Sequence, residues 1–342
     1  MEAFTIGLAC VAFALCWVIC LAAEPLGRRF GLIDAPDGLR KLHARPTPLL
    51  GGAAVALPAL LLMLGEAAAS DFHALWLVLA GLTGAFWLIG AYDDRRHIRP
   101  AVRLALSLLL CLAALAAAPA LQVAFFNFSF VKPALFLDGW ALGFTVISLV
   151  GLQNAVNMAD GKDGLAIGML LLWSALLAVY APPHLLPLLL LLVASLATAL
   201  WFNLRGRLFL GDSGAYSLAI LVGLLAAHAH STSFATLPSD VVALWFLIPV
   251  VDCLRVMMRR IVAGRSPFAA DRTHLHHVLW RMLPWRWGLP LCLGLIAGPA
   301  LLALAAPKQT LLWGVLALSG YATLLGLGVR FTAAETRQPS SA

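Results

Sequence analysis

The sequence carries very little charge. Of its 342 residues, 11% are Asp, Glu, Lys or Arg and 62% are hydrophobic, and the mean hydropathy is +0.93. Soluble domains contain about 25% charged residues, so this scarcity excludes a soluble globular protein. Binding to nucleic acid would need a basic soluble domain, which is absent, so we expect no nucleic-acid partner. The composition indicates a polytopic membrane protein.

Several other signals are missing. The six cysteines lie in or beside apolar stretches without C-x-x-C spacing, so we interpret them as packing residues. The first apolar stretch lacks a basic n-region and an A-x-A cleavage site, so we expect it to be retained as a span. No internal repeat is evident, which disfavours an inverted-repeat transporter.

Long apolar stretches fill most of the chain. Spans of this length and apolarity should be helices, because backbone groups in lipid must be satisfied within the segment. We therefore predict an all-α fold of about eleven transmembrane helices, forming a single transmembrane domain over residues 1–342. A count of ten helices is the alternative, because several spans are marginal. The stretch FFNFSFVKPALFLDGW is one of these, since it can also lie in the membrane interface. The spans lie near residues 3–23, 49–65, 74–91, 102–120, 140–157, 165–181, 184–202, 214–230, 240–257, 288–306 and 310–329.

The basic residues divide unevenly between the two sides of these spans. The alternation of spans places 21 of the 23 Lys and Arg residues on one side, and only Lys132 and Lys308 on the other. Short cytoplasmic loops retain positive charge. We therefore predict the N-terminus outside, the C-terminus in the cytoplasm, and cytoplasmic loops near residues 24–49, 92–101, 158–164, 203–213 and 258–287.

Five aspartates lie at span ends on this cytoplasmic side: Asp93, Asp94, Asp160, Asp163 and Asp212. Adjacent carboxylates stay ionised in a partly dehydrated setting only if a cation or several donors compensate them. Hard oxygen ligands from several loops suit Mg²⁺ that bridges to substrate phosphates. The structural alternatives are a solvated cluster compensated by nearby arginines (Arg95, Arg96 and Arg99) and a helix N-cap at Asp212.

Asparagines precede two of these aspartates. Asn154, Asn157, Asp160 and Asp163 are spaced three residues apart, which predicts polar groups stacked along one slowly drifting helix face. The asparagines have a simpler alternative role, because they often pair helices within the membrane. That role leaves the two carboxylates unexplained.

The longest cytoplasmic loop contains a donor-rich patch. His274, His276 and His277, with Arg265 and Arg272, suit phosphate oxygens, although a pH-responsive surface is an alternative. The spacing and the missing fourth ligand disfavour zinc. In the first loop, the basic residues around His43 suit either a diphosphate or anionic lipid.

Acidic and basic groups on one membrane face favour a metal-bridged diphosphate substrate and a lipid partner. An ion-coupled transporter or flippase is the main alternative, but it would place its acids at mid-span, where only Asp252 approaches. An inactive assembly scaffold is a third hypothesis.

Five ordered motifs carry a family resemblance. The order GLIDAPDGLRKLHARPTPLLGG, DD, NAVNMADGKDGLA, FLGDSG and SPFAADRTHLHH resembles the polyprenyl-phosphate N-acetylhexosamine-1-phosphate transferases over most of the chain. The THLHH motif is more similar to the bacterial undecaprenyl-phosphate GlcNAc-1-phosphate transferase branch than to the phospho-MurNAc-pentapeptide translocase branch. DGKDG does not supply the pattern of the CDP-alcohol phosphotransferases.

The resemblance implies a reaction in the bacterial inner membrane, at its cytoplasmic face. Undecaprenyl phosphate attacks the β-phosphate of a UDP-N-acetylhexosamine, UMP is released, and Mg²⁺, or Mn²⁺ as an alternative, is the cofactor. By resemblance, Asp212 and Asp94 bind the metal, and Asp93, Asp94, Asp160, Asp163, His274, His276 and His277 are catalytic. Substrate binding is implied for Asn154, Asn157, Asn203, Phe209, His43, Arg265, Arg272 and Lys162.

Two positions depart from the family pattern. Lys162 stands between two aspartates where relatives usually have an apolar residue, and Ala215 stands where they often have Ser. The donor therefore stays open among UDP-GlcNAc, the default, UDP-GalNAc and a 6-deoxy UDP-HexNAc. The sequence also leaves three questions open. These are the downstream glycan (O-antigen, capsule, teichoic acid or another), whether the protein forms a homodimer, and whether the reaction is a direct displacement or passes through an aspartyl-phosphate.

Overall fold

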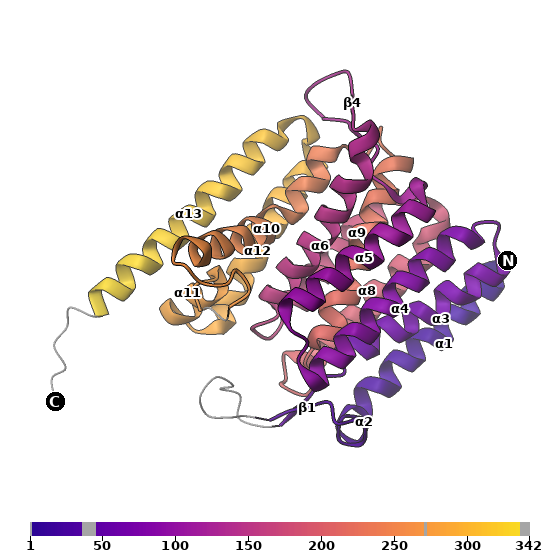
Figure 1. Cartoon of the computed structure of the whole chain (residues 1–342), viewed down its shortest axis with the longest axis horizontal. Helices are drawn as coiled ribbons and strands as arrows, with labels where there is room; N and C mark the ends of the chain where they lie inside the picture. The colour runs from indigo at the N-terminus through magenta and orange to yellow at the C-terminus, as the bar shows by residue number, and fades with distance from the viewer. Residues whose placement is uncertain (1, 36–45, 270–271, 336–342) are drawn as a thin grey trace. The chain divides into compact units, whose positions relative to one another are not determined.

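The computed structural model describes residues 2–35, 46–269 and 272–335, and helices dominate it (Figure 1). Within these ranges, ten helical segments are long and apolar enough to span a membrane, by length and composition, and a shorter apolar helix accompanies them. The all-α prediction of ten to eleven spans is confirmed. The helices that form them are α1 (Glu2–Leu21), α3 (Gly51–Ala69), α4 (His73–Arg96), α5 (Pro100–Ala117), α6 (Ala141–Ala159), α7 (Leu165–Tyr180), α8 (Leu186–Asn203), α9 (Gly211–Thr232), α10 (Ser239–Val262), α12 (Trp285–Ala305) and α13 (Thr310–Glu335).

The shorter apolar helix is α7, with 16 residues. It begins after Gly164, whose φ of +83° favours glycine, and it ends just before Pro182 and Pro183. Proline cannot continue a helix without losing a backbone hydrogen bond. These boundaries explain why α7, which forms the sixth predicted span, is shorter than the other spans.

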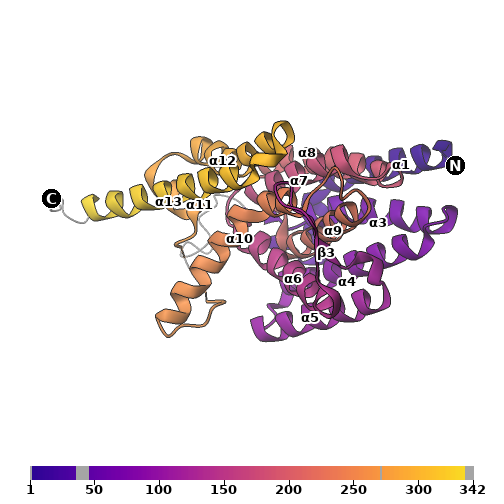
Figure 2. The same cartoon turned by 90° about the horizontal axis from the view of Figure 1, so that it is seen from above.

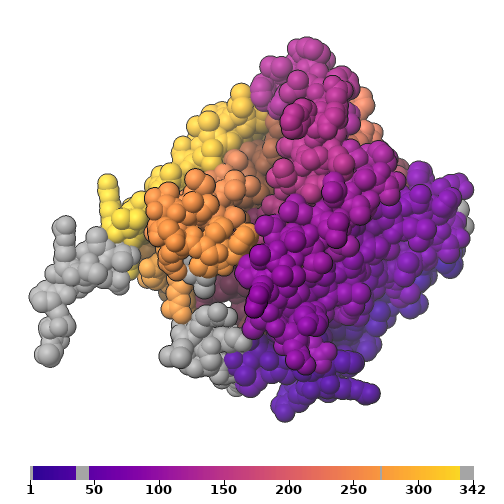
Figure 3. All heavy atoms as spheres, viewed as in Figure 1, coloured from indigo at the N-terminus to yellow at the C-terminus, as the bar shows by residue number. Residues whose placement is uncertain are grey.

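Short elements connect the spans, and the sequence did not predict them. Helices α2 (Ala23–Phe30) and α11 (Leu275–Met282) lie in predicted loops. Strands β1 (Ile33–Asp34) and β2 (Thr47–Pro48) pair antiparallel, with Ile33 opposite Pro48. Strands β3 (Phe125–Phe126) and β4 (Leu135–Phe136) form a second antiparallel pair. Strand β4 is labelled at the upper edge of Figure 1, and atoms of the same magenta colour lie at the top of the space-filling view in Figure 3. Four single 3₁₀ turns, η1 (Pro119–Leu121), η2 (Asp138–Trp140), η3 (Pro183–Leu185) and η4 (Pro307–Gln309), complete the connections.

The chain divides into two compact units. Unit 1 comprises Met1–Phe126 and Ala134–Leu237, and unit 2 comprises Asn127–Pro133 and Pro238–Ala342. Each unit is built from the predicted spans. The prediction of one transmembrane domain over the whole chain stays a prediction.

Helix α9 is the centre of unit 1. It packs against α3, α4, α6 and α7, and 94% of its span lies inside the protein. In the view of Figure 2 the other helices of the unit surround it. Its mean hydropathy of 1.3 is the lowest among the spans, which fits a helix that faces protein instead of lipid.

Unit 2 is a smaller helical group. Helices α10, α12 and α13 pack against one another, and α11 packs against α12 and α13. The segment 127–133 joins this group through Ser129, whose hydroxyl donates to Asp240 on α10 at 2.5 Å. Thr310, at the start of α13, donates to the same carboxylate. These bonds fasten one end of α10 to α13.

Candidate active site

Glycines bring the start of α9 close to α3 and α4. A Cβ at Gly52 on α3 would overlap the backbone of Gly214, and a Cβ at Gly90 on α4 would overlap the backbone of Ser213. Any side chain at these positions would therefore push the helices apart. Close approach of the backbones places the LGDSG motif directly beside the end of α4, where the two adjacent aspartates lie.

The backbone before α9 is fixed by the segment that precedes α3. Phe209 donates its N–H to the Pro48 carbonyl at 2.8 Å, and the carbonyl of Phe209 accepts from Gly51 at 2.8 Å. Gly52 donates to the Leu210 carbonyl at 2.9 Å. These bonds hold the predicted loop near residues 203–213 in one conformation, and the half-buried Phe209 side chain with it.

Asp94 binds the N-terminus of α9. One carboxylate oxygen accepts from the backbone N–H of Asp212 at 2.8 Å and the other from Ser213 at 3.1 Å. These N–H groups have no partner within the helix, and the helix dipole favours negative charge at this end. Asp94 thus holds the backbone from which the Asp212 side chain projects.

Four carboxylates gather around this helix start. Asn157, on the last turn of α6, donates its side-chain amide to Asp212 at 2.6 Å. Burial raises the pKa of Asp160 well above its usual range, and the negative charges of neighbouring carboxylates raise it further. We call this group the carboxylate cluster; it comprises Asp94, Asp160, Asp163 and Asp212.

The Asp93 side chain has different partners from that of Asp94. It is 3% exposed, accepts from the N–H of Ile98 at 2.6 Å, and accepts from the Tyr216 hydroxyl at 2.7 Å. Arg103 on α5 forms an ion pair with it at 3.3 Å and donates to Tyr216 at 2.7 Å. Asp93 is therefore compensated by internal partners, and its predicted place at the reacting phosphates stays a prediction.

The sequence did not identify Arg103 or Tyr216 as site residues. Among the residues that the structure describes, Arg103 pairs with Asp93, whereas Arg95, Arg96 and Arg99 do not. The signal that could have found Tyr216 is its position one helical turn after Asp212, on the face that meets α4.

Only part of the predicted polar face lies on helix α6. The helix ends at Ala159, and Asp160 lies at its C-cap, so Asp160 and Asp163 belong to the turn before α7. The Asn154 amide donates to Val150 of its own helix at 2.8 Å. Lys162 and Asp163 are both half-buried in this turn.

Asn203 is a buried connector. Its side-chain oxygen accepts from the N–H of Gly164 at 2.6 Å, and its amide donates to the Leu208 carbonyl at 2.8 Å. It thus joins the start of α7 to the segment before α9. Lining of a nucleotide pocket by Asn203, expected from the resemblance, stays a prediction.

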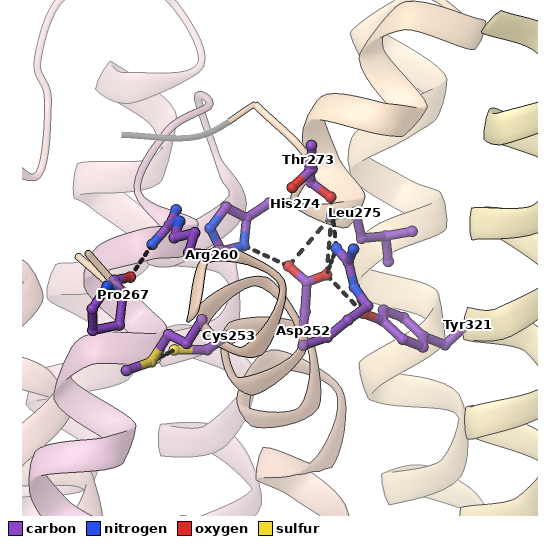
Figure 4. Close-up of polar contacts among 10 residues, drawn as sticks. Asp252, Cys253, Arg260, Pro267, Thr273, His274, Leu275 and Tyr321 are labelled. Atoms are coloured by element: carbon purple, nitrogen blue, oxygen red, sulfur yellow. Dashed lines mark hydrogen bonds and ion pairs between the residues drawn. The ribbon is translucent and has the colours of Figure 1, made fainter. Parts of the chain in front are cut away.

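Unit 2 contains the predicted histidines, and Figure 4 shows the first of them, His274. His274 lies at the N-cap of α11, and its ring stacks on His276, with centroids 5.7 Å apart. The His276 and His277 rings lie 4.2 Å apart. The three histidines thus lie next to one another, and their predicted role toward phosphate stays a prediction. The first of them contacts Asp252, and this pairing was not predicted.

The remaining predicted binding residues are basic and lie at exposed or undescribed positions. Arg265 and Arg272 belong to unit 2 and are both exposed. The carbonyl of Arg272 accepts from the Arg281 side chain at 2.8 Å. His43 lies outside the described residues.

The carboxylate cluster has the donor chemistry for a hard divalent cation. Its ligands are oxygens, and the burial of Asp160 among other carboxylates disfavours its ionised form, a cost that an external cation would relieve. Within the described ranges, no group of three or more His, Cys, Asp or Glu side chains is arranged so that it could hold a metal ion by itself. Mg²⁺ does not require such a group, since it keeps several waters and binds through one or two carboxylates plus substrate phosphates.

Comparison with known proteins identifies relatives of this chain. The family model described as glycosyl transferase family 4 matches residues 75–230, a range that includes the carboxylate cluster, Asp93, Arg103 and Tyr216. A "Probable undecaprenyl-phosphate N-acetylglucosaminyl 1-phosphate transferase" of Bacillus subtilis is 30% identical over 285 residues, covering 79% of this chain and 76% of the relative. The "Undecaprenyl-phosphate alpha-N-acetylglucosaminyl 1-phosphate transferase" of Yersinia pestis is 30% identical (76% and 72% covered), and its namesake in Escherichia coli K12 is 29% identical (76% and 72%).

Proposed function

The chain belongs to glycosyl transferase family 4, and we propose that it transfers N-acetylglucosamine 1-phosphate from UDP-GlcNAc to undecaprenyl phosphate. An oxygen of the lipid phosphate attacks the β-phosphorus of the donor, the bond to the bridging oxygen breaks, and UMP leaves with that oxygen. The product is undecaprenyl-diphospho-GlcNAc. The names of the relatives support the substrates, and the carboxylate cluster supports the chemistry.

The carboxylate cluster is the single observation that carries this proposal. Phosphoryl transfer requires positioning and charge neutralisation more than covalent chemistry from the protein. Mg²⁺, when bound, would supply the charge that neutralises the diphosphate. Asp212, oriented by Asn157 and by the α9 N-terminus on Asp94, is the residue placed to hold it, with Asp94 beside it.

Residues around the cluster keep it in place. Asp93, Arg103 and Tyr216 join α4, α5 and α9 directly behind Asp94 and Asp212. Asp160 and Asp163 add two carboxyl groups from the turn after α6. The histidines of unit 2 keep the role predicted for them, as donors to phosphate or sugar oxygens.

We further propose that the active site faces the cytoplasm of a bacterial cell. The cluster joins the C-terminal end of α4, the turn after α6 and the N-terminal end of α9, which are all ends that the predicted topology places on one side. That side holds 21 of the 23 basic residues.

The donor and the competing functions are tested by one assay. Purified protein in detergent is given undecaprenyl phosphate, Mg²⁺ and, in parallel, UDP-GlcNAc, UDP-GalNAc or a 6-deoxy UDP-HexNAc, and UMP is measured with and without EDTA. We expect lipid-dependent, EDTA-sensitive release, fastest with UDP-GlcNAc. Folded protein that releases no UMP with any donor would contradict the transferase. Substrate flux without release would then favour a transporter or flippase.

A further inference from the structure

Asp252 lies on α10 with its carboxylate surrounded by donors (Figure 4). One oxygen accepts from the Arg255 guanidinium at 2.8 Å and from the Tyr321 hydroxyl at 2.8 Å. The other oxygen lies 2.8 Å from Nδ1 of His274. The backbone N–H of Leu275 donates to both, at 3.2 and 3.3 Å. Asp252 is 8% exposed, so these contacts replace water.

The partners of Asp252 are fixed in turn. Arg255 donates through Nε to Tyr321 at 2.6 Å and through a terminal nitrogen to the Thr273 carbonyl at 2.6 Å. Tyr321 accepts one of these bonds and donates its own proton to Asp252. Helices α10 and α13 and the residue before His274 are thereby held in one arrangement. We call this group the Asp252 network; it comprises Asp252, Arg255, Thr273, His274 and Tyr321.

This arrangement determines which ring nitrogen of His274 carries a proton. Because Arg255, Tyr321 and the Leu275 N–H all donate to Asp252, the carboxylate acts as an ionised acceptor and has no proton to offer. Nδ1 of His274 must therefore be the donor. The other nitrogen, Nε2, makes no hydrogen bond with any residue that the structure describes, so it is the atom that remains to meet a ligand.

We propose that Asp252 is a positioning residue, which holds His274 with Nδ1 protonated and directs Nε2 to the donor. There Nε2 accepts from a sugar hydroxyl when the ring is neutral, and donates to a phosphate oxygen when both ring nitrogens carry a proton. Arg255 and Tyr321 keep the carboxylate ionised and oriented, as the carboxylate partners of functional histidines do in other sites. The ligand in this statement rests on the proposed function. A purely structural role, in which the network only fastens α10, α11 and α13 together, is the competing explanation.

Kinetics of UMP release separate the two roles. We expect Asp252→Asn to lower kcat about 10- to 100-fold, the usual cost of removing such a partner. If Asp252 acts through His274, then Asp252→Asn should change activity by less than about twofold in a His274→Ala background. The matched control is Asp240→Asn, which removes a carboxylate on the same helix that also accepts hydroxyl bonds. It should keep near-normal release.

Each outcome decides the question. Equal losses in Asp252→Asn and Asp240→Asn, or losses that multiply when Asp252→Asn is added to His274→Ala, would overturn the proposal. If Asp252→Asn does not fold, Tyr321→Phe replaces it, with an expected loss of about fivefold, the value of one hydrogen bond, that also disappears in the His274→Ala background.

A second measurement does not depend on turnover. Nitrogen-15 NMR of histidine-labelled protein, with the His274 signal assigned by its loss in His274→Ala, reports which ring nitrogen is protonated. We expect a protonated Nδ1, and a His274 protonated only at Nε2 would overturn the proposal. If the folded wild-type protein releases no UMP, the proposed function fails, while this result still decides whether Asp252 positions His274.

Discussion

The carboxylate cluster of unit 1 and the Asp252 network of unit 2 are both built on aspartates at the ends of, or within, apolar helices. In the cluster, four carboxylates lie together, and the described donors to Asp94 and Asp212 are two backbone N–H groups and one amide. In the network, a single carboxylate receives a guanidinium, a phenol, an imidazole and a backbone N–H.

The difference is one of charge balance. The cluster has more negative charge than its partners compensate, which a protein tolerates where a cation and a charged substrate will bind. The network is balanced within the protein, so its contacts serve to orient a side chain. The two regions also differ in how they are held, because glycine contacts between backbones build the first and side chains build the second.

The largest expected effect is a loss of activity on changing the carboxylate cluster. Asp212→Asn keeps the shape of the side chain and removes its charge, so we expect UMP release to fall at least about a hundredfold, the scale of one preorganised electrostatic group, without a loss of stability. Asp71→Asn, an exposed aspartate of unit 1, is the control and should keep its activity. Near-normal release by Asp212→Asn would remove the cluster from the mechanism.

A change in the Asp252 network should lower the free energy of unfolding. Asp252→Asn leaves Arg255 beside an uncharged group, and breaking a buried ion pair from one side costs about 3 kcal/mol. Equilibrium unfolding of the purified protein in mixed micelles measures this loss of stability. Among the described residues, Asp240 accepts only from uncharged donors, two hydroxyls and the backbone N–H of Ser129, so Asp240→Asn should cost about 1 kcal/mol. Equal costs for the two variants would mean that the charge balance of the network is not what stabilises it.

Backbone contact can be tested separately from charge. A Cβ at Gly90 overlaps Ser213, whereas one at Gly81 on the same helix meets nothing within 4 Å. We expect Gly90→Ala to cost about 2 kcal/mol, as overpacking does, and to lower UMP release by displacing Asp212. Gly81→Ala should change neither. If both variants behave alike, the close approach of α4 and α9 does not build the cluster.

The smallest expected effect is a gain in stability, on replacing Asp160. Burial raises the pKa of Asp160, so its ionised form is less stable in the folded protein than in the unfolded chain, and stability is lost as the pH rises. In EDTA at pH 8, Asp160→Asn should therefore be more stable than the wild type, by about 1 kcal/mol. The gain should shrink as the pH falls and Asp160 becomes protonated. A destabilised variant at pH 8 would show that the cluster is balanced after all.

Hydropathy predicted the spans, because each is a long apolar segment whose helical state is forced by the lipid. Helices α2 and α11 have only eight residues each, too few for that signal. Local spacing placed the aspartates at span ends and predicted a common site. It did not predict that Asp93 and Asp94 face different partners, since this depends on α5 and α9 packing against α4.

The Asp252–His274 pairing was also beyond the sequence. The two residues are separated by 22 positions and by a loop, and neither helix periodicity nor capping rules connect them. In the sequence, Asp252 stood out only as the one acid that approaches mid-span, where a transporter would place its acids. Its partners show instead why a charged residue is tolerated there.

The enclosure of α9 has a consequence for biosynthesis. Its mean hydropathy is 1.3, against 2.5 for the first span, so it is the segment least able to enter lipid unaided. The helices that surround it, α3, α4, α6 and α7, all precede it in the chain and are made before it leaves the ribosome. The order of the sequence thus gives α9 a protein environment in which to insert, and the part of the chain that holds the LGDSG motif is assembled last within its unit.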